Sequence, residues 1–191
     1  MSYESEQAIR KELSNGETLL WTGQPGSGLR LRPADALMIP FSLMWAGFAV
    51  FWEVSVFRTH APFFFRLWGI PFVLVGLYIV VGRFVADAWQ RSRTVYGLTS
   101  QRVIIVGGWG NRQTKSLPLQ QLGAITLSER ADRSGTITFG SAPSGYAWMA
   151  GSGWPGLARQ LPPSFDMVEH ARDLYTRIRE AQQATIAAAG V

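Results

Sequence analysis

The chain has 191 residues, contains no cysteine and carries a formal net charge of +5 at pH 7. The absence of cysteine excludes disulfides, thiolate metal sites and cysteine nucleophiles. Basic residues in the second half are interleaved with acidic ones and form no dense stripe with stacking aromatics, so nucleic acid is not an expected partner.

Two apolar runs, 36–52 and 67–82, contain no charged residue. Extended to 36–57 and 67–84, each approaches the roughly 20 residues that a helix needs to cross a bilayer. The first run is apolar all round and lacks the polar stripe of a soluble amphipathic helix. We therefore predict two transmembrane helices, joined by a loop that is too short to hold a domain.

The two spans are expected to form an antiparallel hairpin that remains in the mature protein, because the first run begins only at residue 36 and a second run follows it. Gly69 and Gly76 are seven residues apart on one helix face, which predicts the seam between the two helices. Glu53 is an acidic residue inside a span, close enough to its end to reach the interface or to pair with Arg58.

Positive charges predict the orientation. Arginine and lysine flank both outer ends of the hairpin, whereas the loop holds only Arg58 and Arg66 together with aromatic residues. We therefore expect both termini on the cytoplasmic side of a multi-pass membrane protein. Three arginines close to the end of the second span are candidates for contact with the membrane surface: Arg83, Arg91 and Arg93.

Beyond the hairpin, short β-branched segments alternate with turn residues. Residues 93–98, 102–106 and 114–117 predict a β-meander, and 124–127 with 136–139 predict a further hairpin. The glycine- and proline-rich stretch that follows is unusually aromatic. We predict that three of its residues contact a partner protein or the membrane: Tyr146, Trp148 and Trp154.

A helix is predicted from Phe165 to about Gln183, with Ser164 as its N-cap. Phe165, Val168 and later apolar residues recur at three- and four-residue steps and form one stripe. The fold class is therefore expected to be α+β: a helical hairpin, then an antiparallel sheet closed by a C-terminal amphipathic helix.

Three segments resemble a known family. Residues 16–25 fit G-E-x-x-x-W-x-G-x-P, and 96–104 fit Y-x-L-T-x-x-R-x-I; residues 135–139 add G-T-I-x-F. This order is similar to that of membrane-anchored bacterial pleckstrin-homology (PH)-like proteins. The residues of the second segment also suit a strand–turn–strand hairpin, in which Arg102 bonds carbonyls or an acidic neighbour.

The resemblance implies a PH-like antiparallel sheet or barrel, capped by the C-terminal helix, at a bacterial inner membrane. The predicted regions are a cytoplasmic N-terminal helix and strand-like segment (1–35) and the two-span hairpin (36–90). They are followed by the cytoplasmic PH-like domain (91–185) and a tail (186–191). Whether 17–25 join the sheet stays open.

No catalytic constellation is visible, so no enzyme, metal or cofactor is expected. His60 and His170 are predicted on opposite sides of the membrane, and residues 151–156 fit G-x-G-x-x-G but are followed by prolines that prevent the helix of a dinucleotide site. The leading hypothesis is a non-enzymatic interaction, scaffold or accessory module with a membrane-protein partner or self-association. The alternative is recognition of an anionic lipid headgroup or small anion.

Overall fold

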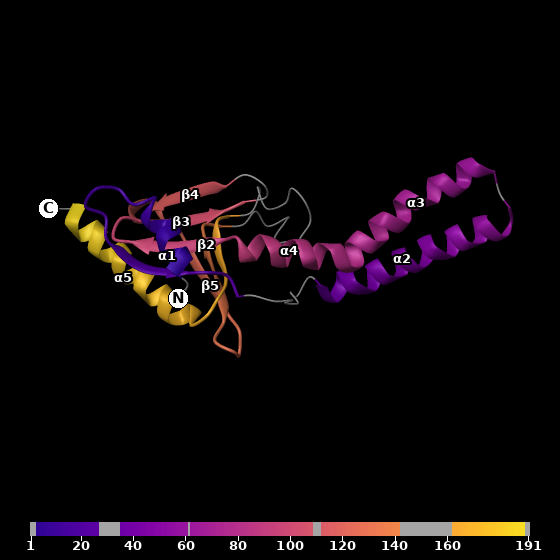
Figure 1. The fold of residues 1–191 in the computed structure, drawn as a ribbon. Helices are drawn as coiled ribbons and strands as arrows, with labels where there is room; N and C mark the ends of the chain where they lie inside the picture. Colours follow the sequence, from indigo (N-terminus) through magenta and orange to yellow (C-terminus); the bar gives the residue numbers. More distant parts are fainter. Residues whose placement is uncertain (1–2, 27–34, 61, 109–111, 142–161, 190–191) are drawn as a thin grey trace. The chain divides into compact units, whose positions relative to one another are not determined.

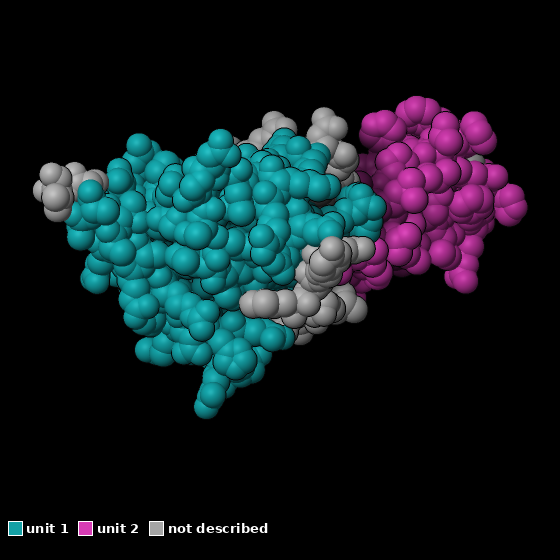
Figure 2. All heavy atoms as spheres, turned by 60° about the vertical axis from the view of Figure 1, so that its left-hand side comes forward, with its two compact units in different colours: residues 1–28, 89–143, 161–191 teal, residues 29–88, 144–160 magenta. Residues whose placement is uncertain are grey.

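The computed structural model describes residues 3–26, 35–60, 62–108, 112–141 and 162–189. The chain divides into two compact units, shown in Figure 2, and each is described by itself. Unit 1 contains residues 1–28, 89–143 and 161–191, and unit 2 contains residues 29–88 and 144–160. Unit 1 is therefore assembled from chain segments on both sides of the apolar helices.

Two antiparallel sheets make up most of unit 1 (Figure 1). One has the strand order β1-β2-β3-β4 and the other β5-β6-β7. The strands are β1 (Leu19–Gly23), β2 (Val95–Thr99), β3 (Arg102–Gly107), β4 (Gln113–Pro118), β5 (Ile125–Glu129), β6 (Gly135–Phe139) and β7 (Ser164–Val168). The strands predicted after the hairpin are thus confirmed, and the barrel is not closed.

Strand β1 joins the sheet although it precedes the apolar helices. It pairs antiparallel with β2, with Trp21 opposite Leu98 and Gly23 opposite Tyr96. This answers the question that the sequence left open about residues 17–25. The apolar helices are an insertion between two hydrogen-bonded strands of one sheet.

Sheet β1-β2-β3-β4 carries apolar residues on both faces. Helix α1 (Tyr3–Arg10) covers one face, where fully buried Ile9 packs with Val95, Ile104 and Val106. A Cβ on Gly97 would lie 2.7 Å from Cγ2 of Ile9, so glycine at this position lets α1 approach the strand. Burial on both faces explains why every residue of β2 is buried.

The main core includes residues of both sheets and helix α5 (Ala171–Ala189). Fully buried Phe165 is at its centre, with ring centroids 4.6 Å from Tyr96, 5.1 Å from Phe139 and 5.8 Å from Trp21. Gln182 fastens α5 by donating to the carbonyl oxygens of Leu119 and Leu122 in and after the short η2 turn (Leu119–Gln121).

The predicted start of the C-terminal helix is wrong. Residues Ser164–Val168 form β7, which pairs with β6, and the helix begins at Ala171. Met167 and His170 have φ values of +51° and +50°, in the left-handed region that a right-handed helix does not continue through. Pairing with β6 buries Phe165 in the core, which outweighs the helical periodicity of this segment.

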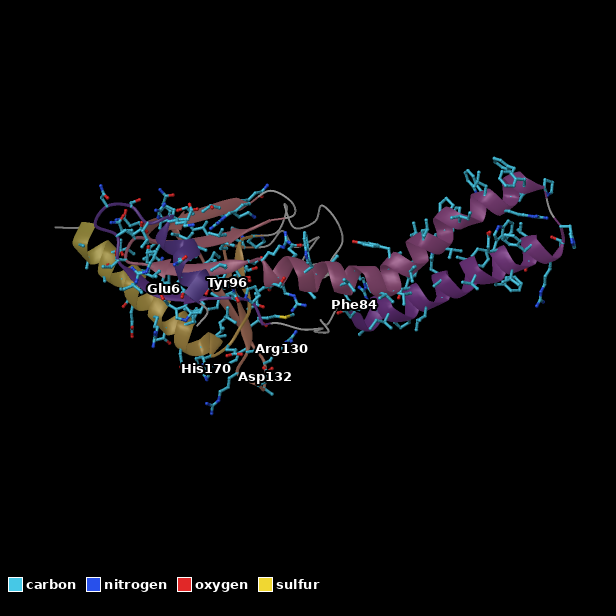
Figure 3. All side chains as sticks on the ribbon, viewed as in Figure 1. Glu6, Phe84, Tyr96, Arg130, Asp132 and His170 are labelled. Atoms are coloured by element: carbon cyan, nitrogen blue, oxygen red, sulfur yellow. The ribbon has the colours of Figure 1, made fainter. Side chains whose placement is uncertain are left out.

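Unit 2 contains the helical hairpin as far as Ala88, and the last turn of its second helix, from Trp89, belongs to unit 1. Helix α2 (Asp35–Arg58) is followed by α3 (Phe63–Leu77), a π-helical turn η1 (Tyr78–Gly82) and α4 (Arg83–Ser92), which together form one helix of 30 residues. Both helices are long and apolar enough to cross a membrane. Figure 3 shows their side chains projecting outward along the hairpin.

The buried residues of α2 and of α3 recur every seven positions. On α2 they are Asp35, Ser42, Ala49 and Val56, and on α3 they are Gly69 and Gly76. A Cβ on Gly76 would lie 3.2 Å from Cα of Ala46, so the helices meet closely there and the predicted seam is confirmed. The carboxyl of Glu53 fills the notch at Gly69, where its Oε2 is buried and has no hydrogen-bond partner among the residues that the structure describes.

Candidate functional site

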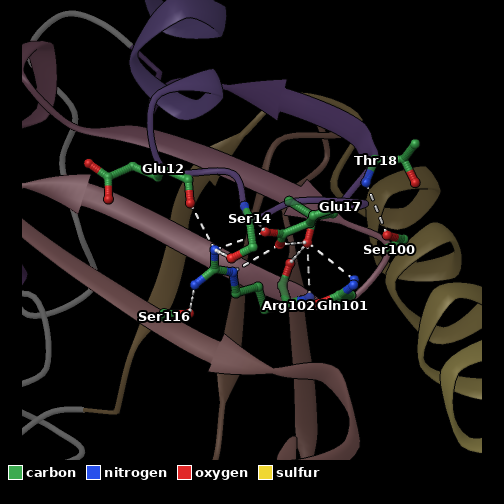
Figure 4. Close-up of polar contacts among 9 residues, drawn as sticks. Glu12, Ser14, Glu17, Thr18, Ser100, Gln101, Arg102 and Ser116 are labelled. Carbon is green, nitrogen blue, oxygen red and sulfur yellow. Dashed lines mark hydrogen bonds and ion pairs between the residues drawn. The ribbon is translucent and has the colours of Figure 1, made fainter. Parts of the chain in front are cut away.

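The two motif segments on either side of the hairpin meet in an ion pair between Glu17 and Arg102 (Figure 4). Arg102 donates from Nε to Oε1 of Glu17 at 2.9 Å and from its terminal NH2 to Oε2 at 2.8 Å. The Thr99 hydroxyl donates to Oε1 at 2.6 Å, and the backbone N–H of Ser14 donates to Oε2 at 2.8 Å. Glu17 therefore receives four hydrogen bonds.

Glu17 is held in its charged form. Its side chain is fully buried, and its pKa is lowered from 4.5 to about 2, chiefly by the hydrogen bond from Arg102, against the opposing effect of burial. The same bond raises the pKa of Arg102. Arg102 also donates to the carbonyl oxygen of Glu12 at 2.8 Å and to the Ser116 hydroxyl at 3.2 Å. These partners occupy its donors, so the pair fastens the fold and is not a ligand site.

Other motif residues also have packing roles. The Trp21 ring lies over Gly23, where a side chain would collide with it. A Cβ on Gly135 would lie 2.6 Å from the carbonyl oxygen of Ser128 and 2.8 Å from Cβ of Ala171. Glycine is thus required where β6 passes β5 and the first turn of α5. The motifs encode strand and helix contacts, as the sequence predicted for Arg102.

The predicted membrane-surface arginines have three different environments. Arg91 is buried in unit 1, where its guanidinium donates to the carbonyl oxygen of Gly26 at 3.1 Å and contacts Sδ of Met167 at 3.4 Å. Gly26 in turn donates its N–H to the carbonyl of Met167 at 2.8 Å. Arg91 thereby holds the segment after β1 against the end of β7.

Arg83 is in unit 2 and pairs with Asp35 at 2.9 Å, with both side chains only 6% exposed. Its guanidinium also lies over the Phe84 ring at 4.4 Å. This pair joins the first residue of α2 to the first residue of α4. Asp35 was not predicted as a partner of Arg83 from the sequence, although opposite charges that bound two apolar runs are a signal for such a pair.

Arg93 follows the end of α4 and is exposed. Its guanidinium carbon lies 4.1 Å from the centroid of the Trp89 ring, a cation–π arrangement. Trp89 is itself 41% exposed. The four-residue spacing of Trp89 and Arg93 is visible in the sequence, but it becomes informative only once the helix is known to reach Ser92.

Tyr146, Trp148 and Trp154 lie outside the described residues, as does the glycine motif at 151–156. Among the residues that the structure does describe, no group of three or more histidine, cysteine or acidic side chains could hold a metal ion. His60 lies between α2 and α3, at the tip of the apolar hairpin. His170, labelled in Figure 3, immediately precedes α5.

Strand β4 is one of the two edge strands of its sheet, and its residues Gln113, Thr114, Lys115 and Ser116 are exposed. Two antiparallel sheets, of four and three strands, packed with a C-terminal helix, define a PH-like domain. Such domains are generally non-catalytic and bind other molecules.

The chain belongs to the Bacterial PH domain family, which it matches over residues 39–182. The match begins within α2 and extends into α5, so it includes both apolar helices. Strand β1 and Glu17 lie before it. No curated protein and no solved structure matches the chain.

Proposed function

We propose that the protein is a non-enzymatic integral membrane protein of the bacterial inner membrane. In this proposal it presents its PH-like unit at the cytoplasmic face as an interaction, scaffold or accessory module. The observation that carries the proposal is the insertion of an exposed apolar hairpin between two paired strands of the PH-like sheet.

The exposure of the apolar side chains of the hairpin supports a membrane environment for it. Only 11% of the most apolar stretch of α2, and 17% of that in the second helix, is buried, which is unlike a helix in a soluble core. Large apolar side chains such as Met44, Phe51 and Leu74 are more than half exposed. A bilayer covers such surface, whereas water would leave it as an aggregation-prone patch.

The pairing of β1 with β2 supports a hairpin that is retained in the mature protein and has both ends on one side of the membrane. If the first helix were a cleaved signal sequence, cleavage would remove β1 and the buried Glu17 from the sheet. Because β1 and β2 are hydrogen-bonded, the chain must leave and return on the same side. The excess of flanking arginine favours the cytoplasmic side.

The exposed edge of β4 supports an interaction role, since edge strands have main-chain groups that a partner strand can pair with. The alternative, that a basic pocket of the sheet recognises an anion, has less support because two candidate arginines already have acidic partners. Arg102 is paired with Glu17, and Arg172 is paired with Glu129 at 2.6 Å.

Co-purification tests the proposal. Tagged full-length protein should resist alkaline carbonate extraction and should elute from gently solubilised membranes with a stoichiometric protein partner or a second copy of itself. A variant that lacks residues 93–191 should stay in the membrane and lose the partner. Release by carbonate would overturn the membrane proposal, and elution of a monomer alone would overturn the interaction proposal.

A further inference from the structure

We infer that Trp89 and Arg93 form a contact site for the phosphate of an anionic phospholipid at the membrane surface. The inference rests on the membrane insertion proposed above. It differs from a ligand pocket in the PH-like sheet, because Trp89 is in the last turn of the second apolar helix and Arg93 directly follows that helix.

Of the three arginines near this end of the hairpin, Arg83 and Arg91 are buried and Arg93 is exposed. Arg83 is buried against Asp35, and Arg91 is buried against Gly26 and Met167, so neither side chain is available to lipid. Arg93 is exposed and has an aromatic ring beneath it. It is the arginine of this group that can meet an external anion.

The stacking geometry suits phosphate. A guanidinium donates hydrogen bonds in its own plane, so a ring against its face fixes its direction without using its N–H groups. The guanidinium carbon lies 4.1 Å from the Trp89 centroid, and this contact leaves the N–H groups available to donate to two phosphate oxygens. Tryptophan is also enriched at the level of lipid headgroups, where its ring meets apolar chains and its N–H meets polar atoms.

Helix length places the pair at headgroup depth. The second helix has 30 residues, or about 45 Å at about 1.5 Å per residue, against a hydrocarbon core of about 30 Å. This length matches the roughly 40–45 Å of a bilayer that includes both headgroup layers. A helix whose first turn lies in one headgroup layer therefore has its last turn, which contains Trp89, in the other.

Native mass spectrometry of the full-length protein tests the inference. The protein is released from vesicles of phosphatidylcholine with phosphatidylglycerol, and retained phosphatidylglycerol is counted. Arg93→Ala should lower retention about fivefold, the change that about 1 kcal/mol for one basic residue near an anionic surface gives. Trp89→Ala should lower it in the same direction, and the double variant should lose no more than Arg93→Ala.

Arg179→Ala is the matched control, because Arg179 is an exposed arginine on α5. Equal retention in wild type and Arg93→Ala, with the protein still resistant to carbonate, overturns this inference and leaves the membrane proposal intact. Equal losses in Arg93→Ala and Arg179→Ala also overturn it, since the effect would then be general charge. If free glycerol phosphate competed for the site as strongly as the lipid does, the ligand would not be a lipid at the membrane surface and the inference would be overturned.

Discussion

Glu17 and Arg102 are 85 positions apart in the chain, yet they share two hydrogen bonds in the structure. Each belongs to a motif on a different side of the apolar helices. Their pair, with Thr99, therefore fixes the segment before β1 onto the turn between β2 and β3. A buried charge that loses its partner is costly, so both residue types are needed together.

Glu17→Gln is expected to destabilise unit 1 by about 3 kcal/mol, because it leaves the Arg102 guanidinium without its counter-charge. Thermal unfolding of the solubilised protein, followed by the near-ultraviolet circular dichroism of the core aromatics, measures the change. Glu129→Gln is the control, since its partner Arg172 is 71% exposed and exposed ion pairs contribute little. Equal effects of the two substitutions would contradict a structural role for Glu17.

Glu17 also makes stability depend on pH. Its pKa is about 2 in the folded protein against 4.5 in the unfolded chain, so the unfolded chain takes up protons first as the solution is acidified. This contribution is complete above about pH 4.5 and is lost as the pH falls toward 2. In Glu17→Gln, the decline of the unfolding temperature over this window should be shallower than in wild type.

At the scale of elements, the hairpin depends on one helix face free of side chains. Gly76→Val should push α3 away from Ala46 and cost about 1–3 kcal/mol, as overpacking does. Gly47→Val is the matched control, because a Cβ on Gly47 meets nothing within 4 Å. The unfolding temperature in detergent should fall only for Gly76→Val. A fall of the same size for Gly47→Val would show that the seam is elsewhere.

Most elements could be predicted from composition and turn residues alone. The strands from Val95 to Phe139 contain β-branched residues and are separated by turn residues, and the apolar helices contain the two charge-free runs 36–52 and 67–82. Strand β7 was missed because Ser164 follows two prolines, which looks like an N-cap, and because Phe165 and Val168 fit a helical stripe. The burial of Phe165 by three distant rings is not visible in a local pattern.

The partners of the arginines were less predictable than the elements. Arg83, Arg91 and Arg93 have the same sequence signature of a positive charge near a span. Their difference comes from tertiary contacts with Asp35, with Gly26 and Met167, and with Trp89. Only the last of these leaves an exposed guanidinium. Charge near a span predicts a position relative to the membrane, but it does not predict which side chain is accessible.

At the scale of the whole molecule, the insertion of the hairpin into the sheet links topology to folding. Strand β1 must wait for β2, which follows both apolar helices, before it can pair. The PH-like unit is therefore complete only after the hairpin has been made.

Cysteine accessibility is the most direct test of this account, because the natural chain offers no background thiol. Single-cysteine variants Asn15→Cys before the hairpin, His60→Cys at its tip and Gln183→Cys on α5 are treated in intact cells with a membrane-impermeant maleimide. We predict labelling of His60→Cys alone, and labelling of the other two only after the inner membrane is permeabilised. Labelling of Asn15→Cys and Gln183→Cys on opposite sides, or of all three variants equally, would contradict a hairpin that crosses the membrane and returns to one sheet.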